Sequence, residues 1–146
     1  MPTLKSFSDP ASMDFVGGTK LDILFNTIPR NIKDVTSFAE MSEISVVITD
    51  AKHPYHVVYV NRSWVALCGY TADEVINKSL HCIQGSETKS SVLRRISRNL
   101  NAKIDCSARL INYKKCGQSF ENLLRIVPLK NRSGQVTHFL GSLEEI

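Results

Sequence analysis

The chain has 146 residues, of which 42% are hydrophobic and 22% are charged, and its formal net charge is +4. This length fits one domain with a real core, and such ordinary composition excludes a chain that is disordered throughout. The basic residues are mostly spread along the chain, which argues against a nucleic-acid interface, and no apolar run approaches the ~20 residues needed to span a bilayer.

Residues 1–44 are predicted to form an arm and a cap ahead of the main domain. Residues 1–19 hold prolines, paired glycines and several serines, which are typical of an extended chain. Weak helical spacing at residues 20–25 and 34–41 predicts two short helices. The second would have Val35, Phe38 and Met41 on one side. Helices this short need an apolar surface to dock on, so the segment is predicted to cap a sheet.

Short strands and short helices alternate in the next part of the chain. Residues 45–49 and 57–60 are rich in β-branched residues, and each run predicts a strand. Ser63 is predicted to cap a short helix. Thr71 and Glu74 have the spacing of a capping box, which predicts the start of another helix.

Residues 77–88 form a stretch of mixed polarity between these short helices and a longer one. The longer helix is predicted to begin at Thr88 or Ser90. Its apolar face would consist of Val92, Leu93, Ile96 and Leu100. A mixed stretch placed between strands and helices in this way predicts a pocket.

Three alternating strands complete the chain. The first places Ile104, Cys106, Ala108, Leu110 and Asn112 on one face. The second places Phe120, Asn122, Leu124 and Ile126 on one face and is predicted to stop at Pro128. The third places Thr137, Phe139, Gly141 and Leu143 together, with Val136, His138 and Leu140 opposite. Turns at residues 114–117 and 131–134 join the strands, so they are predicted to form an antiparallel meander.

The four cysteines, Cys68, Cys82, Cys106 and Cys116, show no CxxC pairing and no metal-ligand spacing. Because the sequence also lacks a recognisable signal peptide, these residues are interpreted as reduced thiols of an intracellular protein, cytoplasmic or nuclear. No nucleophile–base pair or phosphate loop is found, so the chain is not expected to be an enzyme. Neither a nucleic acid nor a membrane is expected as its partner.

Several short motifs, in this order, resemble a PAS domain of the LOV (light-oxygen-voltage) type. They are Val47-Ile48-Thr49-Asp50, Gly69-Tyr70, Gln84-Gly85-x-Glu87-Thr88, Leu110-Ile111-Asn112-Tyr113, Gly117-x-x-Phe120-x-Asn122 and Phe139-x-Gly141. The resemblance covers about residues 45–144. It implies an α+β fold, in which a five-stranded antiparallel sheet carries short helices on one face, with a pocket between. The chain is thus divided into a flanking helical segment, residues 1–44, and a LOV-like domain, residues 45–146.

The resemblance also implies a ligand, because photoactive LOV domains hold a flavin to which a cysteine adds in light. Counted back from Gln84, the position of that cysteine is occupied by Leu80, and Cys82 falls two residues too late. The chain is therefore predicted to be unable to form the photoadduct. The signalling glutamine of the family corresponds to Leu143, and one phosphate-binding arginine corresponds to Ser97, next to Arg98.

The residues predicted to border a bound flavin are Thr49, Leu80, Gln84, Arg98, Asn112, Phe120, Asn122 and Leu143. Two readings of Asn112 and Asn122 stay open: they grip a ligand, or they bond to each other, to Gln84 or to water. Leu80 and Leu143 similarly either line the pocket or fill it. No tightly bound cofactor is expected, with FMN or riboflavin as the alternative.

The other face of the sheet is predicted to be apolar, through Ile111, Tyr113, Leu123, Val127, Val136 and Leu140. Such a face needs a cover, either from the N-terminal segment or from a second copy or another protein. The main functional hypothesis is therefore a sensory or interaction domain that signals through dimerisation or partner binding. The alternative is a sensor that responds to the redox state or occupancy of a flavin.

Overall fold

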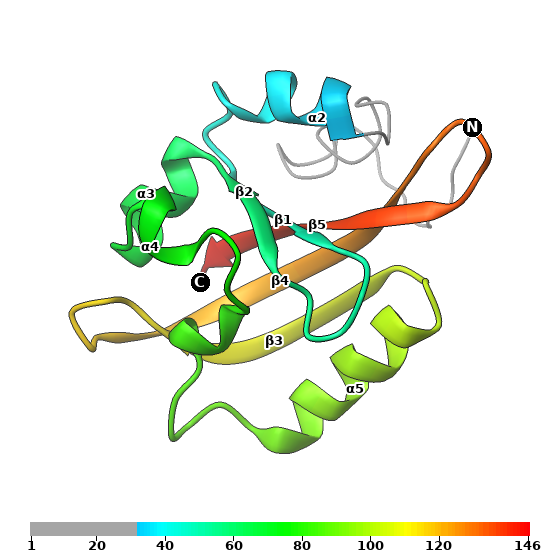
Figure 1. Ribbon diagram of the computed structural model, residues 1–146. Helices are drawn as coiled ribbons and strands as arrows, with labels where there is room; N and C mark the ends of the chain where they lie inside the picture. Colours follow the sequence, from blue (N-terminus) through cyan, green and yellow to red (C-terminus); the bar gives the residue numbers. More distant parts are fainter. Residues whose placement is uncertain (1–31) are drawn as a thin grey trace, which may run out of the picture.

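The computed structural model describes residues 32–146, and the segment at residues 20–25 lies outside them. The helices are α2 (Ile32–Ala39), α3 (Arg62–Cys68), α4 (Ala72–Val75), the 3₁₀ helix η1 (Leu80–Ile83) and α5 (Ser90–Asn101). The strands are β1 (Ser45–Asp50), β2 (Val57–Val60), β3 (Cys106–Tyr113), β4 (Ser119–Lys130) and β5 (Val136–Glu145). All strand pairs are antiparallel, in the order β2-β1-β5-β4-β3 (Figure 1). The predicted α+β architecture is confirmed.

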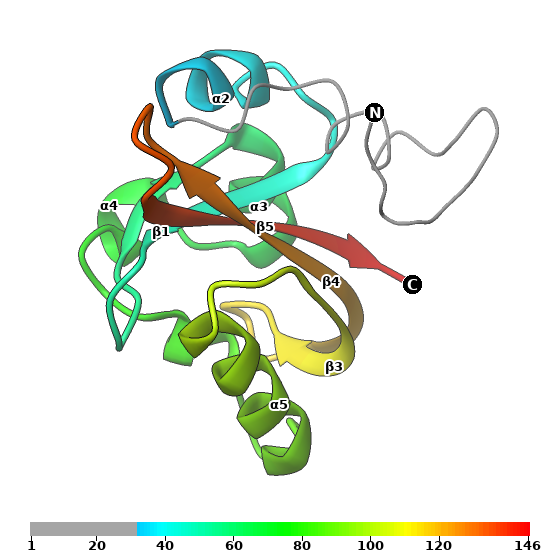
Figure 2. The ribbon, with the colours of Figure 1, turned by 90° about the vertical axis from the view of Figure 1, so that its right-hand side faces the viewer.

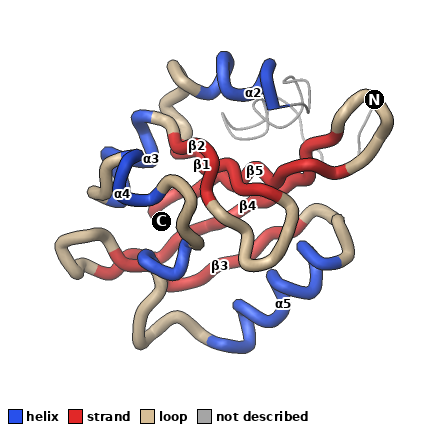
Figure 3. Tube along the Cα trace, in the orientation of Figure 1, coloured by secondary structure: helices blue, strands red, loops and turns tan. Residues whose placement is uncertain are grey.

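Helices cover both faces of the sheet, and the two sides differ. On the outer face, α2 is the one helix from residue 32 onward that lies over β1, β4 and β5 (Figure 2). On the inner face lie α3, α4, η1 and α5, which all come between β2 and β3 in the chain (Figure 3). None of the helices from residue 32 onward has the length and apolar character needed to span a membrane.

The docking of α2 differs from the prediction. The helix buries Val35 and Ala39, which are one turn apart, against Val127 and Leu140 of the sheet. Phe38 is 52% exposed, and Met41 lies beyond the end of the helix and is 73% exposed. The predicted face of Val35, Phe38 and Met41 was therefore wrong in two of its three members, because α2 ends at Ala39 and faces the sheet with its i, i+4 row.

The residue that caps α3 is Asn61, and the prediction of Ser63 was wrong. The Asn61 oxygen accepts hydrogen bonds from the backbone N–H groups of Trp64 at 3.0 Å and Val46 at 2.9 Å. Its amide nitrogen donates to the carbonyl oxygens of Ala39 at 2.9 Å and Ile44 at 2.8 Å. This fully buried amide therefore connects α2, β1 and α3. At the start of α4, the predicted capping box of Thr71 and Glu74 is confirmed.

Two strand boundaries also differ from the prediction. β4 continues through Pro128, which pairs with Phe139 of β5. The pairing of β3 with β4 begins at Cys106 and Ile126, so at Pro128 the strand has β5 as its single neighbour in the sheet and loses little from a missing N–H group. β3 begins at Cys106 and leaves Ile104 outside it, 51% exposed.

Candidate functional site

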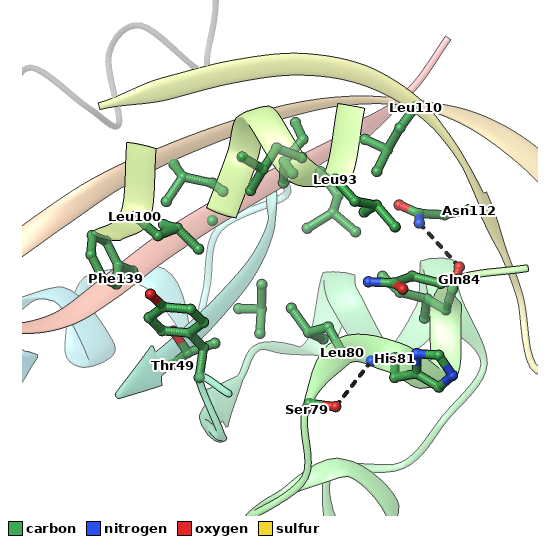
Figure 4. Close-up of a pocket in the computed structure, with 18 of the residues that line it drawn as sticks. Thr49, Ser79, Leu80, His81, Gln84, Leu93, Leu100, Leu110, Asn112 and Phe139 are labelled. Carbon is green, nitrogen blue, oxygen red and sulfur yellow. Dashed lines mark hydrogen bonds between the residues drawn. The ribbon is translucent and has the colours of Figure 1, made fainter. Parts of the chain in front are cut away.

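A cavity of about 270 Å³ lies between the inner face of the sheet and the segments that cover it. Its volume is close to the lower end of the roughly 300–1,000 Å³ that is typical of small-molecule sites. Its walls come from β1, the loop that follows it, η1, α5 and the three long strands (Figure 4). The predicted pocket therefore exists, and the side chains around it do not fill it.

The walls of the cavity are mostly aliphatic. Leu93, Ile96 and Leu100 face it from α5, at the spacing that places them on one side of a helix. On the floor, Gly141 of β5 has no side chain, and a Cβ atom built there would lie 3.3 Å from Cγ1 of Val47. The glycine thus leaves a flat strip of strand along the floor of the cavity.

Two buried amides mark the polar end of the cavity. Asn112 and Asn122 lie diagonally on the inner faces of β3 and β4, and both are almost fully buried. Nδ2 of Asn122 donates to Oδ1 of Asn112 at 2.9 Å, and Nδ2 of Asn112 donates to the Ile83 carbonyl oxygen at 3.0 Å. Oδ1 of Asn122 accepts from the backbone N–H of Glu144 at 3.1 Å.

Within the part of the chain that the structure describes, each of these amide nitrogens still has one N–H group to offer. A primary amide carries two N–H donors, and each nitrogen uses one in the hydrogen bonds given above. The mutual bond between Asn112 and Asn122 is one of the two readings left open by the sequence. It leaves a second N–H group on each nitrogen, so this end of the cavity can still meet the acceptors of a ligand.

The Gln84 side chain extends into the same end of the cavity, beside Asn112 (Figure 4). It follows η1, whose end is fixed by a hydrogen bond from the Gln84 backbone N–H to the carbonyl oxygen of His81 at 3.0 Å. Within residues 32–146 its side-chain amide makes no hydrogen bond. Gln84 therefore presents one donor group and one acceptor group that a ligand could use.

Of the residues predicted to border a flavin, six line the cavity: Thr49, Leu80, Gln84, Asn112, Asn122 and Leu143. Leu80 and Leu143 line it without closing it. The other two do not border it. Phe120 is buried outside the lining, with the Lys114 ammonium 5.7 Å from the centre of its ring, and Arg98 is exposed on α5.

None of the residues that line the cavity is a cysteine. Cys82 is half-buried on η1, where its carbonyl oxygen accepts a hydrogen bond from the Tyr70 hydroxyl at 3.3 Å, and it packs with the cluster that contains Cys68. Burial raises the pKa of Cys68 to about 12 and also raises the pKa of Cys82. These thiols are therefore protonated at neutral pH, and neither of them lines the cavity.

Sequence reasoning missed the aromatic end of the cavity. Tyr55, in the loop between β1 and β2, packs edge-on against Phe139, with ring centres 5.9 Å apart and planes at 80°. Phe139 could be placed on the inner face from the alternation of β5. Tyr55 carries no such signal because it lies in a loop. Pro54 was missed for the same reason, whereas Ser79 and His81, which the resemblance aligns with two polar ligand contacts of the family, also line the cavity.

The outer face of the sheet is covered in part by α2, which belongs to the segment predicted to cap it. Val127 and Leu140 are buried beneath α2, and Val136 packs with the inner cluster because the register of β4 and β5 shifts near Lys130. Tyr113 lies at the end of the edge strand β3, where its hydroxyl accepts a hydrogen bond from the Glu87 N–H at 3.0 Å.

Ile111 and Leu123 are the half-buried apolar residues of the predicted set that remain on this face. Between residues 32 and 146, no group of three His, Cys, Asp or Glu side chains is placed to hold a metal ion.

The family model described as a PAS domain matches residues 43–146. Among curated proteins, the chain is 32% identical over 120 residues to Phototropin-1B of Oryza sativa subsp. japonica. The aligned region covers 82% of this chain and 13% of that protein. It is also 32% identical over 121 residues to a blue-light-activated histidine kinase of Brucella anthropi, covering 82% of this chain and 25% of that protein. The chain thus spans only a small part of the length of these relatives.

Solved structures show the same similarity. The structure described as "Flavin Analogue Sheds Light on Light-Oxygen-Voltage Domain Mechanism" has a TM-score of 0.71 and 26% identity, and the match covers 77% of this chain and 84% of that chain. The light-state structure of the blue-light photoreceptor Aureochrome1 LOV has a TM-score of 0.68 and 26% identity, with coverage of 75% and 87%.

Proposed function

Because this chain belongs to the PAS domain family and is of its LOV type, we propose that it is a sensory domain whose cavity holds a flavin without forming a covalent bond to it. The flavin would act through its redox state or its presence, and the domain would pass that state to a second copy or another protein. The sequence suggested a flavin sensor of this kind as the alternative to a domain that works through partner binding alone. Here the partner interaction is kept as the output of the flavin sensor.

The observation that carries the proposal is the open cavity with amides at one end. The flavin ring system is flat and largely apolar, and it has two carbonyl oxygens and an N–H group along one edge. The spare N–H groups of Asn112 and Asn122 suit those oxygens, and the amide of Gln84 can donate or accept. The aliphatic walls and the flat strip at Gly141 suit the faces of the ring.

The absence of a covalent bond is supported by the residues of η1. A thiol must be held close to one ring carbon in order to add to it. The position expected for that thiol is Leu80, which lines the cavity, whereas Cys82 does not line it. When bound, the flavin would supply redox chemistry, and the residues of this chain would hold and orient it and exclude water.

The proposed output surface is the part of the outer face that α2 leaves uncovered, around Ile111 and Leu123, together with the N-terminal segment. The amides connect this surface to the cavity, because Asn122 accepts a hydrogen bond from the backbone of Glu144 in β5. A change in the ligand that altered the orientation of Asn122 would therefore reach the strand at the centre of the sheet.

The test is an absorbance spectrum of protein incubated with excess flavin and then desalted, before and after blue illumination. A structured flavin band that survives desalting and does not bleach is expected. The variant carrying Leu80→Cys and Leu143→Gln is expected to bleach reversibly, and Leu80→Ala with Leu143→Gln is its matched control. A blank spectrum in the wild type would contradict the flavin proposal and favour a domain that works through partner binding alone.

A further inference from the structure

We propose that the cavity selects an uncharged flavin, such as riboflavin, over a flavin that carries a phosphate, such as FMN. This inference rests on the proposed function, because it concerns the same site, and it names the chemical form of the ligand. It follows from where the chain places its positive charges around the cavity.

Among residues 32–146, those that line the cavity include no lysine, arginine, aspartate or glutamate. Its polar side chains are the neutral ones of Thr49, Tyr55, Ser79, Gln84, Asn112 and Asn122, together with the imidazole of His81 at the rim. A phosphate group is strongly hydrated, and proteins replace that hydration with charge-assisted hydrogen bonds, above all from arginine. The described lining offers polar contacts for a neutral ring and none of the arginine or lysine donors that bind a phosphate most strongly.

The arginines of α5 are neighbours in sequence of the residues that line the cavity, but their side chains do not line it. Successive helical residues are about 100° apart around the axis, so Arg98 lies on the side of the helix opposite to Ile96 and Leu100. Arg94 and Arg98 are both exposed. The Arg95 guanidinium donates to the carbonyl oxygen of Ser107 at 2.9 Å, at the edge of β3. The helix therefore faces the cavity with leucine and isoleucine, and none of its three arginines lines the cavity.

Two lysines come near the cavity, and neither lines it. The Lys103 ammonium donates to the Ala51 carbonyl oxygen at 2.9 Å and lies 5.7 Å from the centre of the Phe139 ring, so it is already engaged. Lys78 is exposed, and its charge acts on Cys82, which is not among the residues that line the cavity. A phosphate at the rim would therefore face solvent without a fixed cation beside it.

The inference can be tested by titrating the protein with lumiflavin, riboflavin and FMN, with quenching of flavin fluorescence as the signal. Riboflavin is expected to bind at least about tenfold more tightly than FMN, a difference of about 1.4 kcal/mol. Lumiflavin, which lacks the ribityl chain, shares the neutral ring and is expected to bind more tightly than FMN as well. FMN binding equal to or tighter than riboflavin binding would overturn the inference while leaving the proposed function intact. Failure of all three flavins to bind would overturn both.

Two variants sharpen the result. Arg98→Ala is expected to leave the affinity for FMN unchanged within twofold, because Arg98 points away from the cavity, and a loss of fivefold or more would overturn the inference. His81→Arg places a guanidinium at the rim and is expected to raise the affinity for FMN by about tenfold, in a manner that added salt reverses. Its matched control is His81→Gln, which is expected to leave the preference for riboflavin in place.

Discussion

Gly85 lies directly against the aromatic ring of Tyr113, with no space for a side chain. A Cβ atom built at this position would overlap the ring. The same tyrosine accepts a hydrogen bond from the Glu87 N–H, so its ring holds the loop after η1 against the edge of β3. Gly85→Ala must displace the ring and is expected to lower the free energy of unfolding by about 1–3 kcal/mol in urea titrations.

The control for Gly85→Ala is the same change in a Tyr113→Ala background. With the ring removed, the added methyl group has room, so the cost of the second substitution should fall to a few tenths of a kcal/mol. A cost that is equal in both backgrounds would show that the overlap is not its cause.

The amide pair of Asn112 and Asn122 is expected to contribute to both stability and binding. Asn112→Leu or Asn122→Leu alone leaves a buried polar partner unsatisfied, which costs about 1–3 kcal/mol. The double variant removes both amides, and its cost is expected to be smaller than the sum of the single costs, as measured by urea unfolding. All three variants should bind flavin more weakly. Strict additivity of the stability losses would argue against the hydrogen bond between the two side chains.

These residues show how far the sequence predicts the site. The period of two along β3 and β4 places Asn112 and Asn122 on the inner face, and the position of Gln84 follows from the motif that it shares with LOV domains. The sequence does not reveal Tyr55, because a loop has no periodicity. Arg98 was predicted to border the flavin because it follows Ser97 in the resemblance, although helical periodicity already places it opposite Ile96 and Leu100.

At the scale of elements, α2 is held to the outer face by a small contact. Val35 is 1% exposed and packs against Val127 and Leu140. Val35→Asp would place a charge in this contact and is expected to cost about 2 kcal/mol or more and to detach the helix. Size-exclusion chromatography with light scattering should then show increased self-association, because the freed sheet surface is apolar.

Phe38→Asp is the matched control on the same helix. Phe38 is 52% exposed, so the new charge is expected to change stability by no more than about 0.5 kcal/mol and to leave the oligomeric state unchanged. Equal effects of Val35→Asp and Phe38→Asp would mean that helix propensity matters more than docking.

The sequence predicts the elements themselves well, and their ends less well. The hydrophobic patterns of β1, β5 and α5 are unambiguous, so these elements are found within a few residues. The cap of α3 was misplaced because Asn61 and Ser63 are equally good capping residues, and the choice depends on bonds from Asn61 to Ala39 and Ile44. The passage of β4 through Pro128 depends on the neighbouring strand, which local sequence does not contain.

For the molecule as a whole, His138 is expected to make stability depend on pH. Partial burial lowers the pKa of His138, and the nearby Asp50 opposes this effect only in part. As the pH falls through about 6.5, the unfolded chain takes up a proton before the folded chain does, so stability declines. The urea midpoint should be lower at pH 5.5 than at pH 7.5.

His138→Gln should reduce this difference between the two midpoints. Glu74 contributes in a separate window, because the hydrogen bond from Lys115 lowers its pKa and its contribution is lost only below about pH 4.5. A slope that His138→Gln does not alter would assign the effect to other groups.

The cavity links ligand binding to the stability of the whole domain. A ligand that binds only the folded state stabilises it by about 2.7 kcal/mol when its free concentration is 100 times its dissociation constant. Riboflavin should therefore raise the melting temperature of the wild type in a concentration-dependent way. Leu80→Trp would direct an indole ring into the same space and should abolish this dependence. Because the indole would bury apolar surface there, the variant without ligand should melt no lower than the unliganded wild type. A variant that retained the riboflavin shift would show that the ligand binds elsewhere.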